Sequence, residues 1–204
     1  MSAAGAAAPR GAEARGGPAG GRIIAVYGSS TAAPGSPEAA LAAEVGRRLA
    51  ERGAVVMSGG YGGVMEAVSR AAREAGGRTI GVTVDSFRGR RPNAYLSVEQ
   101  PTPDLFERLR VLTEEPDGFL VLPGGIGTAV ELFLVWNLMW VGARRPAPLV
   151  VMGPGLQELL SAGPGGLGLP AEALALVSFA RDPEEAVRRV LAGAPGRARD
   201  GGAS

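Results

Sequence analysis

The stretch Pro123-Gly-Gly-Ile-Gly-Thr-Ala-Val-Glu131 decides how this sequence is interpreted. It follows a short apolar run at 119–122 and leads into a longer one at 132–141. This order predicts a buried strand, a glycine-rich turn and a helix that begins near Thr128. Glycines let the backbone approach a ligand, and the N–H groups and positive dipole end of a helix attract an anion such as phosphate. We therefore expect a nucleotide site with Glu131 held about one turn into the helix.

Strand-like and helix-like stretches alternate on both sides of this motif. Expected strands are 23–27, 54–57, 78–84, 96–99 (short), 118–122, 148–152 and 174–179, and expected helices are 37–52, 64–74, 103–115, 128–141, 156–160 and 183–191. Parallel strands need crossover connections, and helices usually supply them. The alternation therefore predicts a Rossmann-like α/β fold, a doubly wound parallel sheet with helices on both faces.

Three turns in this pattern have chemistry that suits a ligand. Residues 28–31 follow the first strand, 58–63 the second, and 123–128 the strand before the helix that contains Glu131. In open parallel sheets, ligands bind beyond the carboxyl ends of the strands, where the strand order switches. We expect the three turns to meet at one edge of the sheet and form one pocket.

The composition excludes several kinds of catalysis. The chain has 204 residues, of which 46% are hydrophobic, so one core of ordinary size is expected. It contains no cysteine, histidine or lysine, and all 21 basic residues are arginine. A Schiff base, a Walker lysine, a Ser-His-Asp triad, a thiolate nucleophile and a conventional zinc site are therefore ruled out. Carboxylates, arginines, hydroxyls, backbone dipoles or an added cofactor must supply any chemistry.

The charge pattern bears on possible partners, and the composition of the two chain ends suggests the domain organisation. The net charge is +1, and the interspersed acidic and basic residues argue against a nucleic-acid partner. Residues 1–21, rich in Ala, Gly and Arg, and residues 193–204 are expected to be disordered tails around a single domain at 22–192. We expect neither a signal peptide nor a membrane span, and hence a cytoplasmic location.

Two motifs together resemble the LOG family of nucleoside 5′-monophosphate phosphoribohydrolases. That family carries a GGG-x-x-G-x-M turn followed by P-G-G-x-G-T-x-x-E, and here the corresponding segments are Ser58-Gly-Gly-Tyr-Gly-Gly-Val-Met65 and 123–131. The segments 26–30 and 117–122 are also similar to the family's strands. The resemblance extends from about residue 22 to residue 191.

The resemblance implies a dimeric, modified Rossmann fold that hydrolyses the N-glycosidic bond of an AMP-like nucleoside monophosphate. The products would be a free base and ribose 5-phosphate, with no metal or other cofactor. The implied catalytic pair is Arg108 and Glu131, in which Arg108 would keep Glu131 ionised by lowering its pKa. The implied substrate- and phosphate-binding residues are Gly28, Ser29, Ser30, Gly59, Gly60, Gly62, Gly63, Met65, Pro123, Gly124, Gly125, Gly127 and Thr128.

The chain departs from the family pattern at two places. Around the catalytic arginine the family often has Met-His-x-Arg-Lys, whereas this chain has Leu105-Phe-Glu-Arg-Leu109, and Ser58 replaces the first glycine of GGG. The alternative function is therefore a non-catalytic nucleotide-binding sensor or carrier. A dinucleotide-dependent oxidoreductase fits less well, because the first turn is not G-x-G-x-x-G and no acidic residue closes the second strand. Family members have also been labelled lysine decarboxylases, which a chain without lysine does not support.

The proposed catalytic residues also have structural interpretations. Thr128 and Glu131 match a capping box, in which the glutamate hydrogen-bonds back to the N-cap amide. Arg108 could form a solvated ion pair with Asp104 or Glu107. Arg110 would compete for its role if the helix were rotated.

Other residues are equally open. Ser29 and Ser30 could cap a turn instead of binding phosphate. The three arginines at 88, 90 and 91 could hold a phosphate, although we favour solvation. The apolar segment 133–140 suits the core and also a dimer interface.

Overall fold

The computed structural model describes residues 21–85, 89–161 and 168–193. Apart from Gly21 and Gly193, the tails expected at 1–21 and 193–204 lie outside these residues, as does Arg88.

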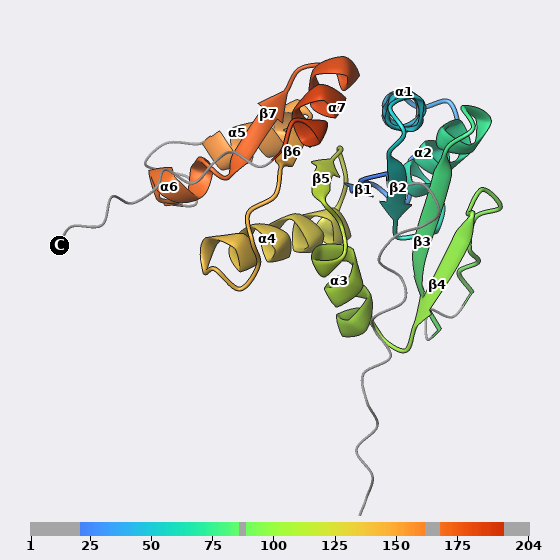
Figure 1. Ribbon diagram of the computed structural model, residues 1–204, viewed down its shortest axis with the longest axis horizontal. Helices are drawn as coiled ribbons and strands as arrows, with labels where there is room; N and C mark the ends of the chain where they lie inside the picture. Colours follow the sequence, from blue (N-terminus) through green and yellow to red (C-terminus); the bar gives the residue numbers. More distant parts are fainter. Residues whose placement is uncertain (1–20, 86–88, 162–167, 194–204) are drawn as a thin grey trace, which may run out of the picture.

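One parallel sheet organises the described residues (Figure 1). Its strands are β1 (Ile23–Tyr27), β2 (Val55–Ser58), β3 (Arg78–Val84), β4 (Val98–Thr102), β5 (Gly118–Val121), β6 (Leu149–Met152) and β7 (Val177–Ala180). Their spatial order is β4-β3-β2-β1-β5-β6-β7, and every neighbouring pair is parallel. The chain first builds outward from β1 to β4, then returns to β5 on the other side of β1. The switch in strand order therefore lies between β1 and β5.

Helices cover both faces of the sheet, which confirms the predicted fold class. They are α1 (Pro37–Glu51), α2 (Val64–Glu74), α3 (Leu105–Glu114), α4 (Ile126–Trp140), α5 (Pro154–Ser161), α6 (Ala171–Leu174) and α7 (Pro183–Leu191). One core packs α1, α2 and α7 against the sheet, and the other packs α3, α4, α5 and α6 against the opposite face. In Figure 1, α1 and α7 accordingly lie above the sheet and α3 and α4 below it.

Strand β1 shows how alternation produces the two cores. Ile24 and Val26 belong to the core under α1, α2 and α7, whereas Ala25 and Tyr27 belong to the core under α3 and α4. Successive side chains of a strand point to opposite faces, so a central strand is apolar at every position. All four of these residues are fully buried or nearly so.

Three expected elements are placed differently in the structure. The short strand expected at 96–99 is β4 at 98–102, an edge strand whose exposed Glu99 and Pro101 hide its pattern. The run 174–179, expected to be a strand, begins within α6, and β7 starts only at Val177. Helix α4 begins at Ile126, two residues earlier than expected.

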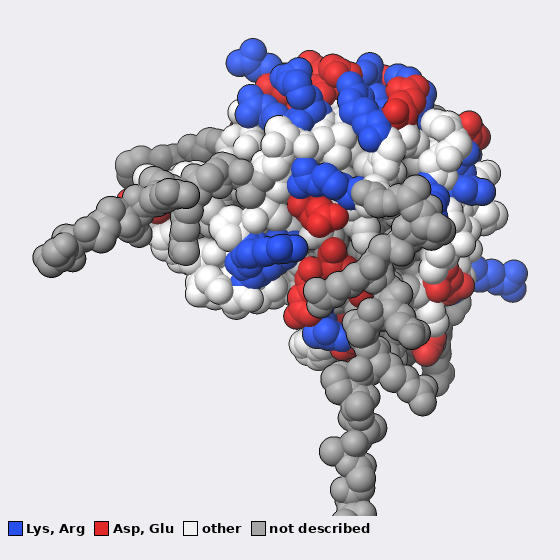
Figure 2. Space-filling view, in the orientation of Figure 1, with Lys and Arg blue, Asp and Glu red and all other residues white. Residues whose placement is uncertain are grey.

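Ion pairs between helices occupy one end of the molecule. Glu184 of α7 pairs with Arg48 of α1 and with the neighbouring Arg52. Figure 2 shows acidic and basic side chains side by side over α1 and α7. The arginines there contact carboxylates and do not form a stripe of one sign.

Candidate functional site

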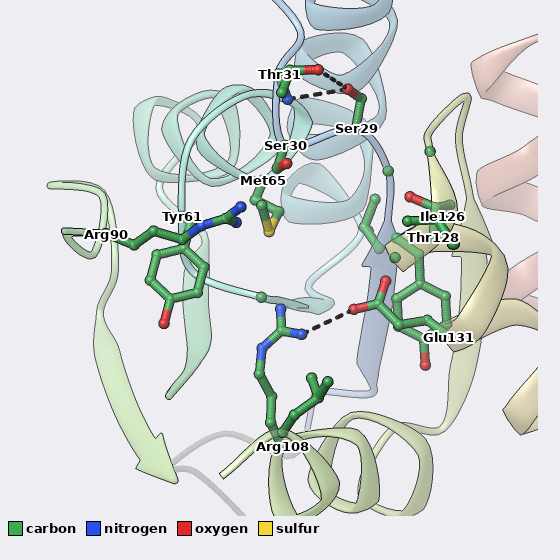
Figure 3. Close-up of a pocket in the computed structure, with 17 residues that line it drawn as sticks. Ser29, Ser30, Thr31, Tyr61, Met65, Arg90, Arg108, Ile126, Thr128 and Glu131 are labelled. Carbon is green, nitrogen blue, oxygen red and sulfur yellow. Dashed lines mark hydrogen bonds and ion pairs between the residues drawn. The ribbon is translucent and has the colours of Figure 1, made fainter. Parts of the chain in front are cut away.

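A pocket of about 680 Å³ lies at the carboxyl ends of β1 and β5, at the switch in strand order (Figure 3). All three predicted turns contribute to its lining, together with α3 and the connection between β3 and β4. The prediction that these turns form one pocket is confirmed. Of the predicted site residues, those that line the pocket are Gly28, Ser29, Ser30, Gly59, Met65, Arg108, Gly125, Gly127, Thr128 and Glu131.

Other predicted glycines shape the turns without lining this pocket. Gly63 is the N-cap of α2, with φ of 68°, and a Cβ there would lie 2.4 Å from the carbonyl oxygen of Ser29. Gly60, with φ of 77°, packs against β3 in the same way. Gly62 lines a smaller adjoining hollow. Gly60 and Gly63 require glycine because their φ is positive and the neighbouring backbone is close.

The first and third turns are joined directly. The backbone N–H of Ser29 donates to the carbonyl oxygen of Pro123 at 3.1 Å. A Cβ on Gly124 would lie 2.1 Å from Oγ1 of Thr128 and 2.9 Å from the nitrogen of Ser29. Pro123 and Gly124 therefore hold the start of α4 against the end of β1.

Arg108 and Glu131 meet on the floor of the pocket. Nη1 of Arg108 donates to Oε1 of Glu131 at 3.3 Å, and Nε donates to the carbonyl oxygen of Val82 at 2.9 Å. Arg108 is 7% exposed and Glu131 8%. Figure 3 shows the two side chains pointing toward one another from α3 and α4. The carbonyl of β3 thus fixes the guanidinium that faces the carboxylate.

This arrangement contradicts the structural interpretation of each residue. The N-cap of α4 is Gly125 and no side chain caps it, so Thr128 and Glu131 do not form a capping box. Arg108 is buried and does not form a solvated ion pair. Instead, Asp104 caps α3, and the exposed Arg110 pairs with Glu107 and Glu114.

Burial changes the expected protonation of Glu131. It raises the pKa of this carboxyl from 4.5 to about 7, although the charge and hydrogen bond of Arg108 lower it in part. Arg108 thus lowers the pKa of Glu131 as expected, but desolvation exceeds the effect of the cation, so the net pKa is raised. Near neutral pH both the protonated and the ionised form are populated. A carboxyl of this kind suits the transfer of a proton.

The N-terminus of α4, which no side chain caps, lies at the rim of the pocket. Gly125 and Gly127 are exposed and flank the first turn of this uncapped helix. Its backbone N–H groups and positive dipole end favour phosphate there. In the adjoining first turn, Oγ of Ser29 accepts a hydrogen bond from the backbone N–H of Thr31 at 3.1 Å. Ser29 therefore caps its own turn and also lines the pocket.

Sequence analysis missed several lining residues. Tyr61 lies within the second glycine turn, and Thr31 ends the first turn. Leu105 precedes Arg108 by about one helical turn. Their closeness in sequence to predicted site residues could have identified all three. Ile126, 86% exposed, lies between two predicted glycines. Arg90, which we expected to be solvated, is exposed but also lines the pocket.

The missing histidine and lysine of the LOG pattern correspond to positions outside the pocket lining, whereas Leu105, at the methionine position, lines the pocket. Phe106, at the position where the family often has histidine, is 84% exposed on α3, and Leu109, at the lysine position, is buried in the protein. Neither lines the pocket. Ser58, which replaces a glycine, accepts a hydrogen bond from the backbone N–H of Gly60 at 3.2 Å. The second turn therefore accommodates its serine.

Among the residues that the structure describes, no group of three or more metal-ligating side chains is placed to hold a metal ion. None of the helices described is both long enough and apolar enough to cross a membrane.

The fold and the pocket define a Rossmann-like α/β protein with a pocket at the switch in strand order. A model of the SLOG cluster4 family matches residues 21–140, and the chain belongs to this family. The match confirms the resemblance to LOG proteins.

Known proteins agree with this assignment. Cytokinin riboside 5′-monophosphate phosphoribohydrolase of Mycobacterium tuberculosis is 39% identical over 116 residues, which are 56% of this chain and 62% of that protein. The protein of the same name from Mycobacterium marinum is 38% identical over 134 residues, 64% of this chain and 70% of that one. The chain thus spans less than two thirds of the first relative.

A solved structure shows the same fold. The molybdenum cofactor binding protein of Rippkaea orientalis has a TM-score of 0.66 and 24% identity, covering 82% of this chain and 94% of that one. At this identity, the likeness concerns the fold alone.

Proposed function

We propose that this protein is a nucleoside 5′-monophosphate phosphoribohydrolase, which hydrolyses the N-glycosidic bond to give a free base and ribose 5-phosphate. One observation carries the proposal: the buried pair of Arg108 and Glu131 forms the floor of a pocket whose rim is the uncapped N-terminus of α4. The printed activity of the two mycobacterial relatives supports it.

The 5′-phosphate binds at the start of α4. Gly125 and Gly127 leave the backbone open to a ligand, since a Cβ at either position would meet no atom within 4 Å. Thr128, which lines the pocket beside them, adds a hydroxyl. A phosphate held there places the ribose deeper in the pocket, toward Glu131.

Glu131 carries the chemistry in this proposal. The bond between C1′ of the ribose and the base nitrogen breaks, its electron pair leaves with the base, and positive charge develops on the ribose. The ionised carboxylate stabilises that charge. Water adds to C1′, Glu131 accepts its proton, and the base nitrogen takes that proton up. Among the described residues that line the pocket, Glu131 alone is acidic.

Arg108 positions the carboxylate. Its hydrogen bond to Val82 fixes the guanidinium, and its charge opposes the rise in the pKa of Glu131. The ionised form is therefore available near neutral pH. No step in this scheme requires a metal or another cofactor.

The test is to incubate the protein with AMP, GMP, CMP and an N6-substituted AMP and to measure the released free base by chromatography. Glu131→Gln keeps the shape and removes the charge, and we expect it to lower the rate by roughly 10²–10⁴-fold. Arg110→Gln is the matched control on α3, because Arg110 is exposed and its partners are surface carboxylates. Equal rates for Glu131→Gln and the parent would refute the role of Glu131.

A non-catalytic nucleotide-binding protein is the alternative, motivated by the missing histidine and lysine around Arg108. The positions of Phe106 and Leu109 outside the pocket lining favour catalysis over this alternative. Nucleotide binding without release of base would establish the alternative. A titration that shows no binding of NAD would exclude the function of a dinucleotide-dependent oxidoreductase.

A homodimer is the proposed assembly. Phe106 of α3 is 84% exposed, and Val130 and Trp140 of α4 are 44% and 43% exposed. Exposed apolar side chains on neighbouring helices are typical of protein interfaces. Sedimentation should give the mass of a dimer for the parent and that of a monomer for Phe106→Glu. A monomeric parent would overturn this assembly.

We also infer that residues 22–192 form a single domain, that the protein works in the cytoplasm and that nucleic acid is not its ligand. Limited proteolysis that leaves a stable fragment close to 22–192 would support the domain assignment.

A further inference from the structure

A smaller hollow of about 200 Å³ adjoins the pocket on the side away from α4. It shares Ser30, Thr31, Tyr61 and Arg90 with the pocket and adds Gly62 and Arg91. The two spaces therefore form one depression. The proposed phosphate at the start of α4, with its ribose at Glu131, leaves this part of the depression unused.

Tyr61 is a rigid wall of this second space. It is 4% exposed, and its hydroxyl accepts a hydrogen bond from the backbone N–H of Val84 at 2.8 Å. The guanidinium carbon of Arg90 lies 5.8 Å from the centre of its ring, and that of Arg108 lies 6.0 Å away. A ring fixed in this way favours a cation above its face. Arg90 is thereby held at the pocket and directed into it, as Figure 3 shows.

The groups around the hollow are suited to an anion. Arg90 and Arg91 supply two guanidinium groups, and Ser30 and Thr31 supply hydroxyls. Guanidinium groups bind phosphate through paired N–H donors. One carboxylate faces the same turn: Oε2 of Glu66 lies 3.8 Å from where a Cβ on Gly62 would be. Two arginines against one glutamate leave the hollow positive.

The hollow and the helix terminus lie on opposite sides of the pocket. In Figure 3, Arg90 and Tyr61 lie on one side, Ile126 and Thr128 on the other, and Glu131 lies between them on the floor. A single phosphate cannot occupy both sides. Two positive regions flanking one carboxylate indicate a ligand with two separate anionic groups.

We propose that Arg90, Arg91, Ser30 and Thr31 form a second anion subsite, and that the pocket therefore takes nucleotides with two phosphate groups in preference to nucleoside monophosphates. This inference rests on the proposed function, since it assigns the first phosphate to the start of α4. The second phosphate is attached to the ribose at the 2′ or 3′ position, because a phosphate that extends the 5′-phosphate would stay on the side of α4.

Calorimetric titration with AMP, ADP, adenosine 2′,5′-bisphosphate and adenosine 3′,5′-bisphosphate tests the subsite. We expect at least one of the two bisphosphates to bind the parent roughly tenfold or more tightly than AMP, whereas ADP, whose second phosphate stays beside the first, should show no such gain. The double variant Arg90→Gln/Arg91→Gln should lose this gain, and Arg91→Gln alone, at a residue that lines only the hollow, should weaken the gain and bind AMP about as well as the parent. Both arginines are exposed, so both variants are expected to fold.

The matched control is Arg181→Gln/Arg188→Gln, which removes the same charge from exposed positions outside the pocket lining. This control variant should bind the two-phosphate ligand more tightly than AMP, as the parent does. The gain should also shrink as salt is added, because exposed charges are screened. Equal affinity of the parent for AMP and for both bisphosphates would overturn the subsite, as would a gain that persists in the Arg90/Arg91 variant.

Measuring base release from AMP in parallel separates this inference from the proposed function. Turnover of AMP without tighter binding of a two-phosphate ligand would refute the second subsite and leave the proposed hydrolase in place. Tighter binding that depends on Arg90 and Arg91 but is accompanied by no release of base supports the subsite and removes the hydrolase. Failure of every nucleotide to bind removes both.

Discussion

Nη1 of Arg108 and Oε1 of Glu131 lie 3.3 Å apart, although the two residues belong to different helices and both are buried. The guanidinium is oriented by the carbonyl oxygen of Val82 on β3. A buried pair of this kind gains little from Coulomb attraction after the cost of desolvation. Its retention on the floor of a pocket is therefore better explained by a role in the site than by stability.

The first prediction concerns the pH dependence of base release. The ionised form of Glu131 is the one that stabilises a cationic ribose, and its fraction rises with pH through a pKa of about 7. The value of kcat/KM should therefore rise about tenfold per pH unit below pH 7 and level off above it. A pH profile on AMP measures this inflection.

Two variants show whether the inflection in the pH profile of kcat/KM belongs to Glu131. Arg108→Gln removes the cation that lowers the pKa of Glu131, so the inflection of its residual activity should move to higher pH. Arg110→Gln on the same helix should leave it in place. A profile that does not change with pH in the parent would contradict the assignment.

The second prediction concerns stability. In the unfolded chain the carboxyl of Glu131 titrates near 4.5, and in the folded protein its pKa is about 7. Between these values the folded state holds a proton that the unfolded chain has released, so this contribution is complete below 4.5 and lost as pH rises to 7. Glutamine does not titrate. Urea unfolding should therefore show the free energy of unfolding of Glu131→Gln rising by roughly 3 kcal/mol relative to the parent between about pH 4.5 and 8.

The comparison between the two proteins is necessary because other carboxylates titrate in the opposite sense. The pKa of Glu44 and that of Glu184 are lowered by hydrogen bonds from arginines, so their contributions to stability grow with pH. These contributions cancel in the difference between parent and variant. A difference that stays constant with pH would show that Glu131 titrates normally.

The sequence predicted the sheet because its central strands are buried on both faces. Such strands are continuous apolar runs, as in Phe119–Leu122, and are easily recognised. Edge strand β4 was misplaced because it is exposed and contains Pro101. Helix α6 was not predicted, and its last residue, Leu174, was assigned to the following strand, because four residues are too few for helical periodicity to appear.

The parts of the site formed by glycine-containing turns could be predicted from the sequence. The contacts between side chains of different helices could not be predicted from local spacing, because they depend on tertiary packing. The three glycine-containing turns were found from the sequence, and they line the pocket. Local spacing on α3 offered Asp104 or Glu107 as the partner of Arg108, whereas the resemblance to LOG proteins implied Glu131. The packing of α3 against α4 brings Arg108 to Glu131. The raised pKa of Glu131 depends on the same packing, because desolvation has no signature in sequence.

The third prediction uses Gly59, which lies beside Arg108. A Cβ at Gly59 would lie 1.8 Å from Nη2 of Arg108 and 2.7 Å from Sδ of Met65. Gly59→Ala should therefore displace the guanidinium from Glu131 and lower kcat for AMP by about tenfold or more, because small misplacements at a reacting centre are costly. Gly62→Ala in the same turn is the control, since the nearest atom to its Cβ is 3.8 Å away. Equal rates for the two variants would mean that the position of Arg108 does not limit the reaction.

The fourth prediction concerns the contact that positions α4. A Cβ at Gly124 would overlap Thr128 and approach the nitrogen of Ser29, whose N–H donates to Pro123. Gly124→Ala should lower the free energy of unfolding by about 1–3 kcal/mol through overpacking and should weaken the binding of AMP. Gly127→Ala, with open space around its Cβ, should leave stability unchanged or raise it, because alanine favours a helix over glycine. Urea unfolding and calorimetry of both variants separate packing from phosphate binding. A stable Gly124→Ala protein that binds AMP normally would show that the first and third turns need not touch for the site to form.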